Sequence, residues 1–369
     1  MTQPRPSGTL YVGLMSGTSL DGADAVLVDF SGAAPRILAS ATVGFEPALR
    51  AELLALNSPG ADEIDRAGRA GNALAEAYAR AVLAVLSEAG AERESVRAIG
   101  CHGQTVRHRP ERGYTVQIGN PARLAERTGI AVVADFRGRD LAAGGQGAPL
   151  APAFHAAAFA SGEEDRAVLN LGGIANLTSL PRDGAVRGFD TGPGNCLMDL
   201  WAGRHLAQPY DADGAWAAGG TVRADLLQGL LREPYFAVPP PKSTGRDLFN
   251  AAWLEAHLRG GEAPRDVQAT LLELTARSVA EAAGRHCAGA RRYIACGGGT
   301  RNGALMRRLE TLLAPAALET SARHGVDPQL VEATAFAWLA KRTLEGLPGN
   351  LASVTGAAGP RVLGAVYPA

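Results

Sequence analysis

The chain has 369 residues, of which 46% are hydrophobic and 20% are charged, a composition typical of globular proteins and unlike that of disordered ones. Its 36 basic and 37 acidic side chains give a formal net charge of −1, which excludes an overall field that draws the protein to nucleic acid or to an anionic membrane. A chain of this length is expected to form two domains.

The four cysteines indicate a reducing compartment. They lie far apart and form no C-x-x-C pair, which argues against a disulfide framework and against a zinc knuckle. The opening residues "MTQPRPSG" lack the apolar core of a signal peptide. The longest nearly unbroken apolar run, residues 151–160, has about half the length of a membrane span. These features predict a cytoplasmic protein.

The first predicted element is a pair of strands joined by a turn that contains glycine. Residues 10–15 and 25–30 are short apolar runs, and the mostly polar residues 16–22 between them predict a tight strand-to-strand turn. Gly17 and Gly22 would allow backbone N–H groups to point at an anion. The turn is therefore either an ordinary hairpin or a phosphate-binding loop.

The rest of the first half alternates helices with strands that run into polar loops. Residues 67–89 are rich in alanine, with apolar residues at helical spacing, and predict a helix. The segments 96–106 and 129–140 each run from an apolar strand into a polar loop, where a βα unit places its functional groups. The segment 144–152 is rich in Gly and Pro, and the first domain boundary is expected close to it.

The second half repeats the order of the opening. Residues 166–180 predict two strands around a Gly-Gly turn, and residues 184–201 predict a strand, a glycine-rich turn and a helix. This weak repeat at the scale of a domain predicts two similar domains. The remaining predicted elements are a proline-rich segment (236–249), a helix (267–287), a strand leading into "CGGGTRN" (291–302) and a last helix (331–346).

Three glycine-bearing turns directly follow apolar strands, at residues 16–22, 172–176 and 297–302, and together they favour a two-domain phosphotransferase. Neither lysine lies in a G-x-x-x-x-G-K-[ST] loop, the turns lack the G-x-G-x-x-G spacing, and H-E-x-x-H is absent from the sequence. His102 is the one histidine close to a predicted site, and its role is open between structure and function.

The first turn would have to bind phosphate without a lysine. Its backbone amides and the hydroxyls of Ser16, Thr18 and Ser19 are the available donors. Asp21 or Asp24 could hold Mg²⁺ through water, because Mg²⁺ keeps several waters and takes one or two carboxylates.

Asp190, in "GFDTGPGN", has two interpretations that the sequence leaves open. A carboxylate at the mouth of a strand, followed by a turn with Gly192 and Gly194, suits proton abstraction from an alcohol or a water. Asp is also a preferred N-cap residue, and Asp190 would then only cap the helix that begins near Asn195.

The sequence resembles the anhydro-N-acetylmuramic acid kinases, of the superfamily that includes sugar kinases, actin and heat-shock-chaperone ATPases. The matching segments lie between residues 13 and 340 and are "GLMSGTSLDGADAVLVDF", "GCHGQTVRH", "QIGNPARLAERTGIAVVADFRGRDLAAGGQGAPLAP", "NLGGIANLT", "GFDTGPGNCLMDLW", "CGGGTRN" and "VEATAFAWLA". Their order and spacing make the resemblance specific. The resemblance is weakest in the proline-rich segment and in the tail.

The resemblance implies an α/β fold in which two ribonuclease-H-like domains (an actin-like ATPase fold) flank a nucleotide cleft. The implied domains are residues 1–147, with the first phosphate turn, and 148–345, with the catalytic Asp and the adenosine side; a tail, 346–369, returns to the first domain. The implied enzyme uses ATP and Mg²⁺ to open the 1,6-anhydro bridge of an amino sugar and to phosphorylate it. Its products are ADP and N-acetylmuramic acid 6-phosphate, in cell-wall recycling. The resemblance also implies a homodimer, whereas the balanced charge and the short apolar runs predict no nucleic-acid or membrane partner.

Individual roles follow from the same resemblance. Asp190 matches the catalytic aspartate. The implied nucleotide-binding residues are Ser16, Gly17, Thr18, Ser19, Asp21, Gly22, Asp24, Gly172, Gly173, Asn176, Gly297, Gly298, Gly299 and Asn302. The implied sugar-binding residues are Gln104, Asn120, Arg137, Asp140 and Glu332. Arg137 suits the lactyl carboxylate, which a guanidinium can bind with two parallel hydrogen bonds; the alternative is a surface pair with Asp140. The residue that holds the metal is unknown.

Two other functions fit the same residues. One is an ordinary hydroxyl kinase of the superfamily, in which Asp190 deprotonates a sugar alcohol. The other is a nucleotide-driven binding protein, in which ATP closes a cleft to regulate a partner. Release of ADP from ATP in the presence of the anhydro sugar, or of the sugar already opened, separates these alternatives.

Overall fold

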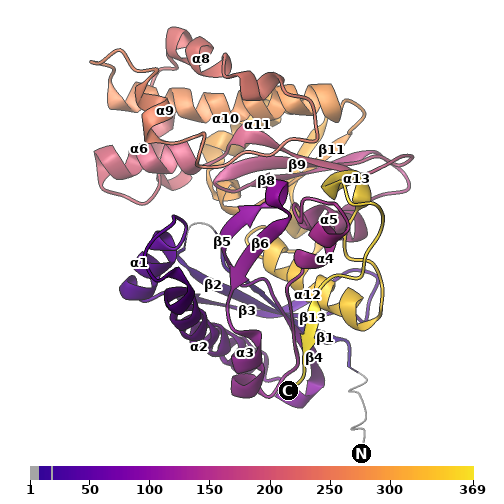
Figure 1. Ribbon diagram of the computed structural model, residues 1–369. Helices are drawn as coiled ribbons and strands as arrows, with labels where there is room; N and C mark the ends of the chain where they lie inside the picture. The colour runs from indigo at the N-terminus through magenta and orange to yellow at the C-terminus, as the bar shows by residue number, and fades with distance from the viewer. Residues whose placement is uncertain (1–7, 18–19) are drawn as a thin grey trace, which may run out of the picture. The chain divides into compact units, whose positions relative to one another are not determined.

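The computed structural model describes residues 8–17 and 20–369, and its contacts divide the chain into two units. Unit 1 comprises Met1–Phe154 and Leu330–Ala369, and unit 2 comprises His155–Gln329. Each unit has a sheet of its own (Figure 1). Each also has its own core of buried side chains. Residues 330–345, which the sequence analysis assigned to the second domain, therefore belong by their contacts to unit 1.

Unit 1 contains a six-stranded sheet with the strand order β13-β7-β4-β1-β2-β3. Its strands are β1 (Leu10–Met15), β2 (Gly22–Asp29), β3 (Arg36–Gly44), β4 (Val96–Cys101), β7 (Val132–Ala134) and β13 (Ala365–Tyr367). β1, β2 and β3 are antiparallel neighbours, β4 and β7 run parallel to β1, and β13 is antiparallel to β7. The predicted opening strand pair is present as β1 and β2, and the end of the chain returns to this sheet.

Helices cover both faces of this sheet. α2 (Glu63–Ala89) packs on the face that carries Val12, whereas α12 (Val331–Leu344) packs on the face that carries Tyr11. Successive side chains of a strand point to opposite faces, so β1 is buried on both sides. The other elements of unit 1 are α1 (Pro47–Ala55), β5 (Gln104–Arg109), β6 (Tyr114–Ile118), α3 (Pro121–Thr128), α4 (Gly138–Ala142) and α13 (Ala352–Thr355). The chain passes into unit 2 within α5 (Ala151–Phe159).

Two glycines let α12 lie directly against the strands. A Cβ built on Gly13 would lie 1.9 Å from Ala333 O, and one built on Gly100 would lie 2.0 Å from Phe336 O. Both oxygens belong to the backbone of α12, which cannot move as a side chain can. The close approach of helix and sheet therefore depends on the absence of a side chain at these positions.

We expect Gly100→Ala to lower the free energy of unfolding by about 1–3 kcal/mol, the usual cost of inserting an atom into a packed core. Gly68→Ala is the matched control, because Gly68 lies in α2 and a Cβ there would meet no atom within 4 Å; it should stabilise the protein by about 0.5–1 kcal/mol. Urea unfolding followed by circular dichroism measures both changes. Equal effects of the two variants would contradict the packing of α12 on β4.

Unit 2 contains a five-stranded sheet with the order β10-β9-β8-β11-β12. Its strands are β8 (Arg166–Leu171), β9 (Ile174–Leu180), β10 (Arg187–Pro193), β11 (Arg292–Cys296) and β12 (Ala317–Thr320). β8, β9 and β10 are antiparallel neighbours, and β11 and β12 run parallel to β8. The helices are α6 (Cys196–Leu206), α7 (Ala215–Ala218), α8 (Ala224–Leu231), α9 (Ala251–Glu255), α10 (Pro264–His286) and α11 (Gly303–Leu313). Side chains of α6, α10 and α11 form one core with the sheet.

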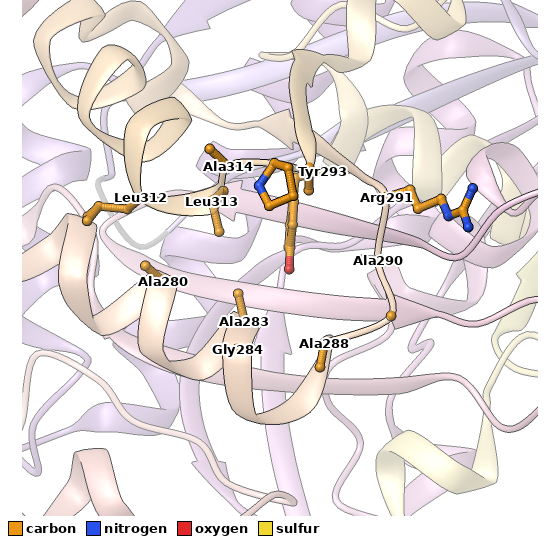
Figure 2. Close-up of a pocket in the computed structure, with 13 residues that line it drawn as sticks. Ala280, Ala283, Gly284, Ala288, Ala290, Arg291, Tyr293, Leu312, Leu313 and Ala314 are labelled. Atoms are coloured by element: carbon orange, nitrogen blue, oxygen red, sulfur yellow. The ribbon is translucent and has the colours of Figure 1, made fainter.

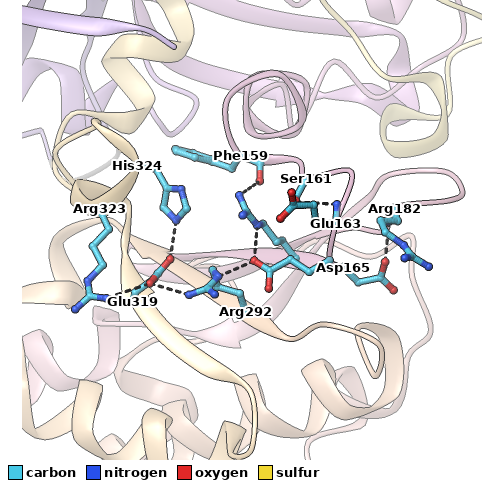
Figure 3. Close-up of polar contacts among 11 residues, drawn as sticks. Phe159, Ser161, Glu163, Asp165, Arg182, Arg292, Glu319, Arg323 and His324 are labelled. Carbon is cyan, nitrogen blue, oxygen red and sulfur yellow. Dashed lines mark hydrogen bonds and ion pairs between the residues drawn. The ribbon is translucent and has the colours of Figure 1, made fainter. Parts of the chain in front are cut away.

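An ion-pair network joins three strands of unit 2 (Figure 3). Glu164, which precedes β8, accepts from Arg166 Nε at 2.9 Å and from Arg292 Nε at 2.7 Å. Arg292 also donates to Glu319 of β12 at 3.0 Å, and Glu319 bonds His324 Nε2 at 2.7 Å. Because the groups are partly buried and linked, the network helps to fix the order of β8, β11 and β12.

Five strands of each sheet share one topology, which confirms the predicted fold class, and β13 is an additional edge strand of unit 1. In each unit three antiparallel strands are followed by two strands parallel to the first, so both sheets have the arrangement of ribonuclease-H-like domains. The predicted internal repeat corresponds to this shared order. None of the helices in the described part of the chain is both long and apolar enough to span a bilayer.

Candidate active site

Asp190 lies in β10 beside an irregularity of the sheet. The register of β10 against β9 shifts between Asp190 and Gly192, and bulges of this kind re-aim a side chain. Two groups that follow α8 in the sequence bond Asp190. Thr244 N–H, in the proline-rich segment, donates to Asp190 Oδ2 at 3.0 Å, and Tyr235 Oη, just before that segment, donates to the Asp190 carbonyl at 2.8 Å. The N-cap of α6 is Asn195, so the capping interpretation of Asp190 is wrong.

The environment of Asp190 suits a general base. Burial raises the pKa of its carboxyl to about 6, and the Thr244 N–H and the Lys242 charge lower it only in part. A carboxyl with this pKa is mostly ionised at neutral pH. It is also a stronger proton acceptor than an exposed Asp, because the best catalytic pKa lies near the working pH.

Two asparagines extend a polar row from Asp190 across the sheet. Asn176 lies directly opposite Asp190, and Asn170 lies directly opposite Asn176. Opposed residues of neighbouring strands share a face. Leu169, next to Asn170, packs into the core formed with α10, so the row lies on the other face. The sequence analysis predicted Asn176 and missed Asn170, although a lone Asn in the apolar run "RAVLNL" was a usable signal.

The glycine turn 172–176 joins β8 to β9 and contacts the start of α6. Gly173 O accepts from Gly194 N at 2.9 Å and from Cys196 N at 3.1 Å. Arg246 lies beside this turn, since a Cβ built on Gly173 would be 3.6 Å from Arg246 Nη2. A cation next to a glycine turn suits a phosphate. The sequence analysis missed Arg246 because it lies in the proline-rich segment, for which the resemblance is weakest.

The turn 297–302 leads from β11 into α11 and touches the polar row. Gly297 has φ +84°, and a Cβ there would lie 2.4 Å from Asn170 Oδ1, so this position requires glycine. Gln329 Nε2 donates to Gly297 O at 3.0 Å. Asn302 accepts from Leu305 N–H at 3.0 Å and caps α11. Gly298 and Gly299 belong to the single turn of 3₁₀ helix between Gly297 and Asn302.

In unit 1 the first turn joins β1 to β2, as predicted, but the Ser16 hydroxyl points into the protein. Ser16 Oγ bonds Tyr78 Oη at 2.7 Å and Gly103 O at 3.3 Å, and the residue is buried. Gln104 Nε2 donates to Gly17 O at 3.3 Å and so fixes the beginning of the turn. Thr18 and Ser19 lie outside the described residues. Gly22 opens β2 and pairs with Gly44.

Asp21 and Asp24 are the predicted carboxylates for a metal ion. Asp21 is exposed and pairs with Arg50 at 3.2 Å, and Asp24 accepts from Thr42 Oγ1 at 2.6 Å. Within the described residues no group of three His, Cys, Asp or Glu side chains could hold a metal. An ion held mainly by nucleotide phosphates and water, with one carboxylate, is compatible with this arrangement.

Arg137 is the predicted ligand of the sugar carboxylate. Arg137, beside α4, donates through Nη1 to Gly147 O at 2.8 Å and through Nη2 to His102 Nε2 at 2.7 Å. Burial lowers the pKa of Arg137 to about 10, and the charges of Glu332 and Asp140 act in the opposite direction. Arg137 therefore stays charged at neutral pH, close to His102 and Glu332.

Asn120 and Asp140 are bonded within the protein. Asn120 caps α3 by accepting from Arg123 N–H at 3.0 Å, and its Nδ2 donates to Asn72 at 2.6 Å. Asp140 is completely buried, so the alternative of a surface pair between Arg137 and Asp140 is wrong.

Figure 2 shows a pocket of unit 2 that is not a candidate active site. It has a volume of about 600 Å³ and is lined mainly by alanine, glycine and leucine residues. It lies at the beginning of β11, whereas the turn 297–302 follows the end of that strand. Arg291 extends away from it, and the Tyr293 hydroxyl donates to Cys287 O at 3.4 Å. The pocket therefore offers little polar chemistry.

Comparisons with known proteins point to one family. The family model described as anhydro-N-acetylmuramic acid kinase matches residues 9–369. A protein of that name from Burkholderia vietnamiensis is 60% identical over 98% of this chain and 97% of its own length. One from Burkholderia lata is 59% identical, with the same coverage of 98% and 97%. Among solved structures, an activator of 2-hydroxyisocaproyl-CoA dehydratase from Clostridium difficile with bound ADPNP matches with a TM-score of 0.47 and 14% identity, over 91% of this chain and 97% of that chain.

Proposed function

The chain belongs to the anhydro-N-acetylmuramic acid kinase family, and on this premise we propose how its residues perform the reaction. The enzyme uses ATP to open the 1,6-anhydro bridge of 1,6-anhydro-N-acetylmuramic acid and to phosphorylate O6. It releases ADP and N-acetylmuramic acid 6-phosphate, a step in the recycling of peptidoglycan. The observation that carries the mechanism is the partly buried Asp190, held by the Thr244 N–H at 3.0 Å.

The structure of the substrate determines which molecule the base must deprotonate. An anhydro sugar has no free 6-hydroxyl, so water attacks C1 while the bridging oxygen leaves C1 and attacks the γ-phosphorus. Asp190 takes one proton from that water. The electron pair of the broken C1–O bond stays on the bridging oxygen and forms the new O–P bond, and ADP leaves. General base catalysis of this kind contributes about 10²–10⁴-fold.

Phosphoryl transfer itself needs positioning and charge neutralisation. We propose that the turns 16–22 and 172–176 bind the phosphates, with the Arg246 guanidinium beside the second turn, and that the turn 297–302 binds the adenosine side. Mg²⁺, when bound, would neutralise phosphate charge, and Asp21 or Asp24 would hold it through water.

For the sugar, we propose that Arg137 binds the lactyl carboxylate. A guanidinium has five N–H groups, and Arg137 uses three of them on His102 Nε2 and Gly147 O. N–H groups on the two Nη atoms of a guanidinium suit a bidentate carboxylate. Gln104, Asn120 and Glu332 stay proposed sugar-binding residues. A homodimer is proposed from the resemblance, and a cytoplasmic location from the unpaired cysteines and the opening residues.

The test is to supply ATP with either 1,6-anhydro-N-acetylmuramic acid or N-acetylmuramic acid and to follow ADP. We expect stoichiometric ADP with the anhydro sugar, and mass spectrometry should identify N-acetylmuramic acid 6-phosphate. An ordinary hydroxyl kinase would use the opened sugar instead. A nucleotide-driven binding protein would release ADP slowly and equally with either sugar.

A further inference from the structure

The end of the chain is bonded to the region that holds Arg137. We propose that the tail residues Asn350 and Thr355 position the Arg137 guanidinium through the buried carboxylate of Asp140. The inference rests on the proposed contact between Arg137 and the substrate carboxylate, and it makes Asp140 a positioning residue rather than a sugar ligand.

The Asp140 carboxylate lies at the centre of the arrangement. Thr355 Oγ1 donates to Asp140 Oδ1 at 2.7 Å, and Asn350 Nδ2 donates to the same oxygen at 2.6 Å. Gly147 N–H donates to Asp140 Oδ2 at 2.8 Å. Asp140, Asn350 and Thr355 are all buried. Both carboxylate oxygens thus accept from protein donors. Gly147, which binds Oδ2, lies more than 200 residues before the two tail residues that bind Oδ1.

Backbone hydrogen bonds tie the same two segments together. Gln146 N donates to Thr355 O at 2.8 Å, and Ala358 N donates to Ala143 O at 2.8 Å. Gly145 lies flat against the carboxylate, since a Cβ there would be 2.2 Å from Asp140 Oδ2. The loop of residues 143–147 therefore takes its shape from the tail and from Asp140.

Gly147 links Asp140 to Arg137 by hydrogen bonds. Its N–H is bound by Asp140, and its carbonyl accepts from Arg137 Nη1 at 2.8 Å. The other side of the guanidinium is held by His102 Nε2, which accepts from Nε at 3.2 Å and from Nη2 at 2.7 Å. Since Arg can only donate, this His102 nitrogen carries no proton. Burial and the Arg137 charge keep the pKa of His102 well below its ordinary value, which agrees with a neutral ring.

The guanidinium is thus held by His102 and by Gly147, and only the contact with Gly147 depends on the tail. A planar fork binds a carboxylate bidentately only when its orientation is right. If the loop 143–147 loosens, Arg137 loses the Gly147 contact and can turn about its contact with His102. The consequence is weaker binding of the substrate carboxylate, with no change in the binding of ATP.

The experiment removes one hydroxyl from the tail. Thr355→Val deletes the donor to Asp140 Oδ1 at nearly constant volume and should raise the KM for 1,6-anhydro-N-acetylmuramic acid about threefold to tenfold, less than the full worth of one hydrogen bond to a charged group, because the loss reaches Arg137 only through the loop 143–147. The KM for ATP should stay the same, and Thr355→Ser, which keeps the hydroxyl, should restore the sugar KM. Thr355→Ala serves as a second variant that lacks the hydroxyl if Thr355→Val folds poorly.

The matched control is Thr128→Val. Thr128 is a buried threonine of unit 1 whose hydroxyl donates to Leu124 O at 2.8 Å, in a different part of the unit. Its loss should leave both KM values unchanged. An equal rise of the sugar KM in this control would show a general loss of stability and would overturn the inference.

A double-mutant cycle separates this inference from the proposed function. In an Arg137→Ala background, Thr355→Val should have no further effect on the sugar KM, because the residue that it positions is gone. If Arg137→Ala by itself leaves the sugar KM unchanged, the proposed role of Arg137 is wrong. If Arg137→Ala raises the KM but Thr355→Val does not, or if the two effects add, the positioning role of the tail is wrong.

Discussion

Asp190→Asn should keep the fold and the affinity for ATP but lower kcat by at least about 10²-fold, the low end for removal of a general base. Asparagine has the same shape, and its Oδ1 can still accept from the Thr244 N–H that now binds Asp190 Oδ2. It cannot take a proton from water. The loss should therefore appear in turnover and leave the hydrogen bonds around β10 in place.

Steady-state kinetics and ATP titration measure the two quantities, and circular dichroism checks the fold. Asp165→Asn is the control: Asp165 precedes β8 and accepts from Arg182 N–H at 2.8 Å, so the change removes a charge from the same unit. Its activity should be close to that of the wild type. Near-normal turnover of Asp190→Asn would end the assignment of Asp190 as the base.

The pH dependence of kcat/KM is an independent test of Asp190 as the base. Burial raises the pKa of Asp190 to about 6, and the base works only when deprotonated. The kcat/KM for the sugar should therefore be level above pH 6 and fall by about tenfold per pH unit below it. A descending limb near pH 4 would mean an Asp without the raised pKa, and would point to another group as the base.

Local sequence signals predicted the two halves of the fold well. The strand pairs β1–β2 and β8–β9 are each two apolar runs around a glycine turn, and strand pairing across a tight turn depends on neighbouring residues alone. The same holds for α2, whose alanine-rich apolar face determines a helix without reference to other segments. The shared order of the two sheets then follows from the internal repeat.

Contacts between distant segments were not predictable from such signals. α12 follows unit 2 in the sequence but packs on β1 and β4 of unit 1. The information for this contact lies in Gly13 and Gly100, which leave room for the backbone of the helix. A glycine in a strand has several explanations, and only the folded chain shows which one holds.

In the candidate site, too, local signals identified individual residues but not the distant groups that contact them. Asp190 was found because a Gly-rich turn exposes it, but the groups that hold it come from residues 235–244, where proline fixes an irregular path and no period exists to interpret. Asp140 was singled out from the sequence, but the donors to its carboxylate could not be predicted. Its donors, Asn350 and Thr355, belong to a tail without a recognisable pattern.

A reaction run in ¹⁸O-labelled water should place the label on the anomeric hydroxyl of the sugar product and none in its phosphate. If water attacks C1 while the bridging oxygen becomes the phosphate ester, the oxygen from water must end on C1 and the ester oxygen must come from the sugar. A kinase that acts on an already opened sugar needs no water in its own turnover. The label therefore distinguishes the two mechanisms by the origin of single atoms.

Mass spectrometry of the product, with fragmentation that separates the phosphate from the anomeric carbon, gives the position of the label. The reaction must be quenched early, because the anomeric oxygen exchanges with solvent; N-acetylmuramic acid 6-phosphate incubated in labelled water for the same time measures that background. Label at C1 well above background, reached at the rate of ADP release, requires a water activated beside C1, which is the position that the proposed role of Asp190 demands. An unlabelled anomeric oxygen, or label in the ester linkage, would exclude coupled ring opening and would remove the reason for a base that acts on water.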